Sequence, residues 1–180
     1  MPTQTVIIGK PGDQEYLSYY GRYISQVSTD NIVAYLGQQG HDFSDYLAAV
    51  SEQQSEFRYA SGKWSAKEVL GHINDSERVF SYRALRISRN DKTPMEGFEQ
   101  DDYVRDGPFN HMRWNDLVED FRGVRAATVS LFRNLSEEES LRRGIANKAE
   151  VSVRALAWII AGHAVHHQQV LRNAYNLSKS

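Results

Sequence analysis

The chain of 180 residues contains no cysteine. This absence excludes thiolate ligands for zinc, structural disulfides and a cysteine nucleophile. Any metal site must therefore use histidine, aspartate, glutamate and water, and any sulfur nucleophile must come from a cosubstrate. A glycine-rich phosphate loop and a serine nucleophile elbow are also absent from the sequence, so ATP use and hydrolysis by a serine triad are not expected.

Long apolar runs and an excess of charge are missing as well. No hydrophobic stretch approaches the roughly 20 residues of a membrane span, and the first residues do not resemble a signal peptide. The formal net charge of -2 provides no basic surface for nucleic acid or for an anionic membrane. We therefore expect a cytoplasmic protein that acts on a small molecule, without nucleic-acid or membrane partners.

Apolar residues recur at three- and four-residue steps through most of the chain, which predicts an all-α protein. We expect an irregular N-terminal lead at residues 1–12 and a single domain at 13–180. The first arm of this domain combines helical pieces at 13–27 and 32–50. Longer helices are expected at 65–90, 113–135 and 152–176, with a short helix at 136–144 and a loop at 144–151. No stretch has a convincing strand pattern.

The connection at 91–112 is long for a compact domain and has no helical period. If this segment crosses between the second and third arms, the four arms form a four-helix bundle with up-down-down-up connectivity. Connections of this length often serve as lids or binding loops. We expect the segment to border the functional pocket.

Three of the six histidines lie within five residues, inside an apolar helical stripe. Since each helical residue turns about 100°, His163 and His167 share the inward face, and His166 lies at its edge. His72 lies on the inward face of the helix expected at 65–90. In the up-down-down-up bundle the second and fourth arms are antiparallel, which brings His72, His163 and His167 to within about one helical turn of a common depth. The pattern predicts that three imidazoles meet in the core.

Two motifs carry a family resemblance. The first runs from Lys63-Trp64-Ser65 through Gly71-His72-Ile73 to Arg83, and the second is His163-Ala-Val-His166-His167 followed by Gln169. Over roughly residues 13–178 the chain resembles the DinB/YfiT-like family. The resemblance implies a four-helix bundle, often a homodimer, that binds one divalent metal ion, zinc or nickel, through His72, His163 and His167. Some relatives transfer a thiol such as bacillithiol or mycothiol, and others are described as metal-dependent hydrolases.

Three imidazoles leave a divalent ion with open coordination positions, as in catalytic zinc sites. We narrowly favour transfer of a small thiol to an electrophile, because hydrolysis usually needs a carboxylate base. Asp75 is the nearest acid and is expected to orient His72; Arg83, if it points inward, could bind a carboxylate of the cosubstrate. The alternatives are a hydrolase that uses Asp101 or Asp102 of the long connection, a non-catalytic binding module, and a structural bundle that forms an oligomer interface.

Overall fold

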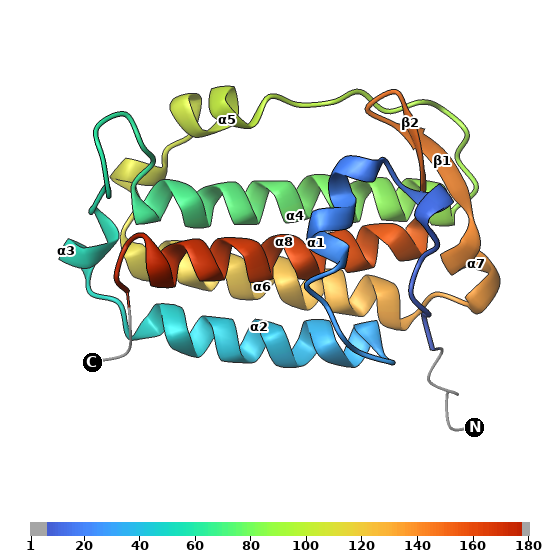
Figure 1. Ribbon diagram of the computed structural model, residues 1–180, viewed down its shortest axis with the longest axis horizontal. Helices are drawn as coiled ribbons and strands as arrows, with labels where there is room; N and C mark the ends of the chain where they lie inside the picture. Colours follow the sequence, from blue (N-terminus) through green and yellow to red (C-terminus); the bar gives the residue numbers. More distant parts are fainter. Residues whose placement is uncertain (1–6, 178–180) are drawn as a thin grey trace.

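The computed structural model describes residues 7–177 (Figure 1). Four long helices form the predicted four-helix bundle: α2 (Ile32–Ala48), α4 (Ala66–Ser88), α6 (Trp114–Arg133) and α8 (Val153–Asn173). The remaining elements are the 3-10 turns η1 (Asp13–Glu15), η2 (Ser18–Tyr20) and η3 (Phe109–His111), the helices α1 (Gly21–Ile24), α3 (Glu52–Ser55), α5 (Gln100–Asp106) and α7 (Glu137–Leu141), and the strands β1 (Arg143–Ala146) and β2 (Ala149–Ser152). None of the described helices combines the length and apolar character needed to cross a membrane.

Hydrogen bonds between helix ends show the direction of α4 against α8. The hydroxyl of Tyr175, just after α8, donates to the carbonyl of Trp64, just before α4, at 2.6 Å. At the opposite end Arg142, whose carbonyl accepts from the amide of Val153 at the start of α8 at 3.0 Å, donates its guanidinium to the carbonyl of Ser88 at the end of α4. The two helices are therefore antiparallel. Figure 1 shows α4 and α6 running in one direction and α2 and α8 in the other.

The helix boundaries follow from local capping chemistry. The capping box at the start of α4 forms as expected: Ser65 Oγ accepts from the amide of Glu68 at 3.1 Å, and the Glu68 carboxylate accepts from the amide of Ser65 at 2.7 Å. The hydroxyl of Ser152 likewise accepts from the amide of Ala155 at the start of α8. These contacts fix the first turns of the two helices that carry the histidines.

The expected helix at 13–27 is wrong. Tyr16 (φ -158°, ψ 159°) and Leu17 (φ -62°, ψ 132°) are extended, so the segment consists of short turns and the single helical turn α1. The helix was expected because Tyr16, Tyr20 and Tyr23 recur at steps of four and three residues, but this spacing reflects contacts with other helices instead. The ring of Tyr20 packs edge-on against Phe80 of α4 with centroids 6.0 Å apart. Tyr20 and Tyr23 therefore face the core without a continuous helix, whereas Tyr19 is exposed.

The expected loop at 144–151 is also wrong, because this segment forms an antiparallel hairpin in which Arg143 pairs with Ser152. Asn147 and Lys148 both have positive φ, at 50° and 62°, which suits a two-residue turn matching the strand twist. Met95 of the long connection extends the hairpin by donating its amide to Ile145 at 3.0 Å and accepting from Asn147 at 2.9 Å. The hairpin thereby anchors one end of the 91–112 segment.

The apolar core has two parts along the bundle axis. One cluster surrounds Trp158 and Phe132 near the hairpin end, and the other surrounds Trp114 and Phe121 near the opposite end. On α8 His163 falls between the two clusters, and on α4 His72 lies next to Ile73, the last residue of the second cluster before the gap that ends at Phe80. The bundle therefore has a polar layer at mid-height, and this layer holds the candidate site.

Candidate metal centre

The three predicted histidines meet in the polar layer. His72 comes from α4, and His163 and His167 come from successive turns of α8. Their Nε2 atoms converge: the Nε2 of His163 lies 3.1 Å from that of His72 and 3.1 Å from that of His167. Each histidine offers one ring nitrogen within 4.8 Å of those of the other two.

The spacing fits a metal ion with imidazole ligands. Nitrogens at the ordinary zinc distance of about 2.0–2.1 Å in a tetrahedral site lie about 3.3 Å from one another. The two distances of 3.1 Å are close to this value. Ring nitrogens so close together, aimed at one point, are stabilised by a shared cation that accepts a lone pair from each. The donor set can therefore hold one divalent ion.

Burial keeps the imidazoles neutral, which metal binding requires. Burial, with a smaller contribution from the nearby His166, lowers the pKa of His72 to about 4. Burial also lowers the pKa of His163 and of His167 well below the ordinary value, and the neighbouring imidazoles act in the same direction. At neutral pH each ring therefore has an unprotonated nitrogen available as a ligand.

In the structure the side chain next to the Nδ1 of His72 is that of Ser76, whereas Asp75 was expected there. Ser76 Oγ lies 3.4 Å from the Nδ1 of His72, whereas Asp75 contacts Arg78 at 3.5 Å. The helix explains the difference, because a residue four positions along lies about 40° from His72 and one three positions along lies about 60° to the other side. Burial raises the pKa of Asp75, Arg78 opposes this, and Asp120 adds to it. The expected role of Asp75 in orienting His72 is not supported.

Aromatic rings form the walls of the site. The ring of Trp64 lies 5.0 Å from that of His72, and the ring of Tyr23 lies 5.4 Å from that of His163. The approach of Tyr23 depends on Gly162, because a Cβ at position 162 would lie 2.1 Å from the carbonyl oxygen of Tyr23. The first sequence motif included Trp64, but Tyr23 belongs to neither motif, so its position at the site was not predicted.

Two cavities reach the histidines. One of about 400 Å³ is lined by His72 and His163 together with Tyr20 and Phe98. The other, of about 520 Å³, is lined by His167 with Trp64, Tyr59 and Tyr175. Asp101 of α5 lines both cavities. The long connection thus borders the site, as expected from its length.

The other polar candidates have different surroundings. Arg83 does point inward: it is 4% exposed and donates to the carbonyl of Glu96 at 2.8 Å. Asp102 is exposed and forms an ion pair with Arg105 at 2.5 Å. Of the two aspartates considered as a base, only Asp101 lines the cavities that reach the histidines.

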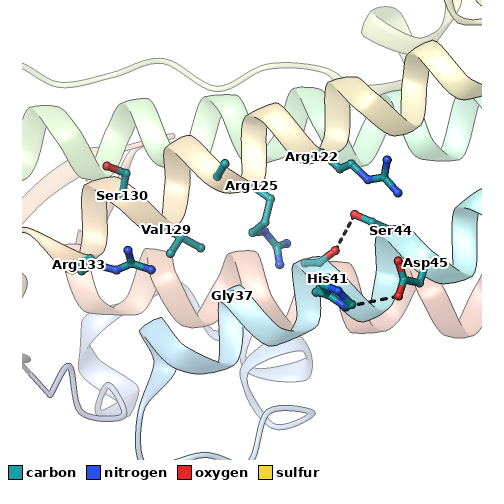
Figure 2. A pocket seen from close by; sticks show the side chains of 11 residues that line it. Gly37, His41, Ser44, Asp45, Arg122, Arg125, Val129, Ser130 and Arg133 are labelled. Carbon is teal, nitrogen blue, oxygen red and sulfur yellow. Dashed lines mark hydrogen bonds and ion pairs between the residues drawn. The ribbon is translucent and has the colours of Figure 1, made fainter.

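A separate groove lies on the opposite pair of helices, between α2 and α6 (Figure 2). It has a volume of about 550 Å³ and includes Gly37, His41, Arg122 and Arg133, but none of the three converging histidines. The sequence did not indicate this groove, because its residues have no common motif.

The family of the chain follows from comparison with known proteins. The model of the DinB superfamily matches residues 35–171, which is most of the chain and includes all three histidines. The chain therefore belongs to the DinB superfamily, and the resemblance found in the two motifs is confirmed. Over 122 residues, 66% of this chain and 69% of the relative, it is 24% identical to a protein of Oceanobacillus iheyensis named "Putative metal-dependent hydrolase".

Two solved structures share the fold. YfiT from Bacillus subtilis, described as a probable metal-dependent hydrolase with an unusual four-helix bundle topology, superposes with a TM-score of 0.69 at 14% identity over 91% of each chain. The mycothiol-dependent maleylpyruvate isomerase superposes with a TM-score of 0.66 at 11% identity, over 81% of this chain and 61% of the isomerase chain. At these identities the likeness shows the shared bundle alone.

Proposed function

We propose that this protein is a metal-dependent transferase that joins a small thiol to an electrophilic substrate at His72, His163 and His167. The observation that carries the proposal is the position of the three histidines between two cavities of similar size, about 400 and 520 Å³. A transfer reaction needs room for two organic cosubstrates beside one centre, whereas hydrolysis needs one substrate and water. The name of the mycothiol-dependent neighbour agrees with a thiol as one of the two.

The fit of the donor set makes one divalent ion, zinc or nickel, the expected cofactor. When bound, it would supply open coordination positions and lower the pKa of a thiol. With the Nε2 of His72 used as a ligand, its Nδ1–H can donate to the hydroxyl of Ser76, which holds the ring in its orientation. Trp64 and Tyr23 narrow the space around the imidazoles and limit the entry of water.

The transfer step balances as a substitution. The thiol gives up its proton, and a sulfur lone pair forms the bond to the electrophilic carbon. The leaving group departs with the electron pair of its former bond to that carbon and takes up a proton. Asp101, which lines both cavities, is the carboxylate placed to accept the thiol proton.

Hydrolysis is the second candidate, and the position of Asp101 is the observation that favours it. A carboxylate beside the centre can remove a proton from an attacking water. The printed names of the Oceanobacillus and Bacillus relatives point in the same direction. In this version of the reaction one cavity holds the acyl part of the substrate and the other its leaving group.

The metal site is tested first by elemental analysis of the purified protein and its variants. We expect one divalent ion per chain, a sharp loss of metal in His72→Ala, His163→Ala and His167→Ala, and full retention in His166→Ala. His166 is a matched control because it lies on α8 next to His167 and contributes no converging nitrogen. Full metal content in His72→Ala would show that the proposed ligand set is wrong.

The reaction is tested on metal-loaded protein with two panels of substrates. The first pairs N-acetylcysteine with the electrophile 1-chloro-2,4-dinitrobenzene, and the second contains esters, amides and lactones without thiol. Turnover in the first panel that is lost in His163→Ala supports transfer. Metal-dependent turnover in the second panel alone would replace transfer by hydrolysis, and the Asp101→Asn variant should then lose most of it.

A further inference from the structure

Arg83 is a buried cation without a carboxylate partner. Arg83 is 4% exposed, and no carboxylate within the described residues 7–177 lies within 4.0 Å of its guanidinium. Most other arginines of the bundle do have such a partner, including the equally buried Arg125, which pairs with Glu77. An isolated buried charge is costly, and a structure that retains one usually supplies a counter-charge from elsewhere.

The contacts of Arg83 leave much of its donor capacity unused. Its Nη2 donates to the carbonyl of Glu96 at 2.8 Å, and its guanidinium lies 6.0 Å from the ring of Phe80. Burial lowers the pKa of the guanidinium, and the neighbouring Tyr20 opposes this shift. An arginine has five N–H donors in a planar fork, and a carboxylate can accept from two of them at once.

Arg83 lines a small cavity that adjoins the larger cavity over the candidate metal centre. This cavity has a volume of about 20 Å³ and is lined by Arg83 with Leu17, Tyr20 and Phe80. The last three residues also line the larger cavity that reaches His72 and His163. Glu150 lines the small cavity too, but its carboxylate pairs with Arg143 at 2.7 Å and is half exposed. The small cavity therefore adjoins the larger one and has Arg83 in its lining, and we call it the recess.

Arg83 also has a fixed relation to the metal ligands along α4. It follows His72 by eleven residues, which is close to three full turns, so both side chains lie on one face about 16 Å apart along the axis. Helical side chains lean toward the N-terminus, which directs the Arg83 side chain back toward His72. A ligand in the larger cavity can therefore place one end at the histidines and the other at the guanidinium.

We propose that Arg83 binds a carboxylate group of the substrate that occupies the cavity over His72 and His163, and so selects for anionic substrates. The lining of the recess combines the Arg83 cation with mostly apolar residues, and its one acid, Glu150, is already paired with Arg143. A carboxylate matches that charge and the planar fork of the guanidinium, whereas a phosphate dianion would leave one negative charge without a partner. This inference names the substrate class for the function proposed above and rests on that proposal for the reaction, although binding can be tested without turnover.

The binding test uses hexanoate, with hexanamide as its uncharged isostere, on the purified protein as isolated and after metal removal with a chelator. The Nε–H resonance of Arg83, assigned by its absence in Arg83→Gln, should shift when hexanoate is added and should remain in place with hexanamide. Loss of a charge-assisted hydrogen-bonded pair should weaken hexanoate binding roughly 10- to 100-fold in Arg83→Gln. Arg83→Lys keeps the charge but loses the planar fork of donors, so its affinity for hexanoate should lie between those of the unmodified protein and Arg83→Gln.

Controls separate the recess from the metal. Arg86→Gln removes an arginine from the next turn of α4 that already pairs with Asp91, and it should bind hexanoate as the unmodified protein does. His72→Ala should retain hexanoate binding while losing metal. Equal binding of hexanoate and hexanamide, no shift of the Arg83 resonance, or tighter binding of methylphosphonate than of hexanoate would each overturn the carboxylate assignment.

A kinetic comparison links the recess to the reaction. In metal-loaded Arg83→Gln the KM for N-acetylcysteine or for a carboxylate-bearing electrophile should rise, while the KM for the corresponding methyl ester stays unchanged. Failure of every substrate panel with intact hexanoate binding would contradict the proposed reaction and leave the recess supported. Turnover with equal KM for acid and ester in both proteins would contradict the recess and leave the reaction supported.

Discussion

Replacing Glu77 by glutamine should destabilise the bundle by about 3–5 kcal/mol, because it breaks a buried ion pair. The Glu77 carboxylate accepts from Nε and Nη2 of Arg125 at 2.8 and 2.9 Å, and the two side chains are 3% and 4% exposed. The Nη1 of Arg125 donates to the side-chain oxygen of Gln39 at 2.8 Å and to the carbonyl of Leu36 at 3.2 Å. Glutamine keeps the shape of Glu77 but leaves the guanidinium charge without compensation.

The magnitude follows from burial. An exposed ion pair contributes at most about 1 kcal/mol, whereas an unpaired charge in the interior retains most of its desolvation cost. For a chain of this length each kcal/mol lowers the melting temperature by roughly 2–4 °C, so the expected drop is on the order of 6–20 °C. Gly40 limits the room for adjustment, since a Cβ at position 40 would lie 2.6 Å from Cγ of Arg125. The side chain of Arg125 points from α6 toward α2 (Figure 2).

The assay is urea unfolding at pH 7, followed by circular dichroism at 222 nm, on metal-free protein. The midpoint should fall in Glu77→Gln while the dependence of unfolding free energy on urea stays constant. Glu119→Gln is the matched control, because Glu119 and Arg122 form an exposed pair on the same bundle and its loss should cost less than about 1 kcal/mol. A loss below about 1 kcal/mol in Glu77→Gln as well would refute the reasoning.

Three further predictions concern pH, packing and metal. Burial raises the pKa of Glu15, but hydrogen bonds from Arg154 and the amide of Gly12 outweigh it and hold the pKa at about 2, below the ordinary 4.5. The folded-state pKa is the lower one, so this stability is present above pH 4.5 and is lost toward pH 2. It amounts to at most about 3 kcal/mol, and unfolding of Glu15→Gln should show a weaker acid dependence. Gly162→Ala should cost more than about 2 kcal/mol by urea unfolding, since its Cβ would collide with the backbone of Tyr23. Chelation should lower the melting temperature of metal-loaded protein, because metal present at 100 times its Kd adds about 2.7 kcal/mol to the free energy of unfolding. The melting temperature of His163→Ala should not change on chelation.

The sequence predicted the long helices and the meeting of the histidines because both depend on local periodicity. An apolar stripe at helical spacing determines which face of α8 is buried, and His163 and His167 lie within that stripe. The capping box at Ser65 predicted the start of α4 for a similar reason, since its hydrogen bonds join residues only three positions apart. Features set by neighbours along the chain could therefore be predicted.

Features set by distant neighbours could not. The hairpin turn has Asn147 and Lys148 at positive φ without the glycine that usually indicates such a turn. Its strands gain a further partner from Met95, some fifty residues away in sequence. The spacing of tyrosines near the N-terminus resembled a helical stripe, although the side chains reach the core from separate turns. Ser76 was overlooked because a carboxylate is the commoner partner for a metal-binding histidine.

The polar layer connects the buried ion pair to the candidate metal centre. Gln39, which accepts from Arg125, donates its amide to the carbonyl of Ala161 at 2.9 Å, two residues before His163 on α8. The chain of contacts therefore joins all four long helices at the height of the histidines. A hydrophobic replacement of such a pair often restores stability, but it cannot replace the directional bonds that set the position of one helix against another.

The double variant Glu77→Leu with Arg125→Met separates these two roles. It should recover most of the stability lost in Glu77→Gln, because no unpaired charge remains. A loss of about 1–3 kcal/mol should persist, because the side-chain oxygen of Gln39 no longer has Arg125 as its donor. Metal affinity should be reduced, since ligand atoms must be held to within about 0.5 Å and Gln39, which donates to Ala161 of α8, would no longer be held in place by Arg125. Recovery of both stability and metal affinity would mean that apolar packing alone positions the imidazoles of α8.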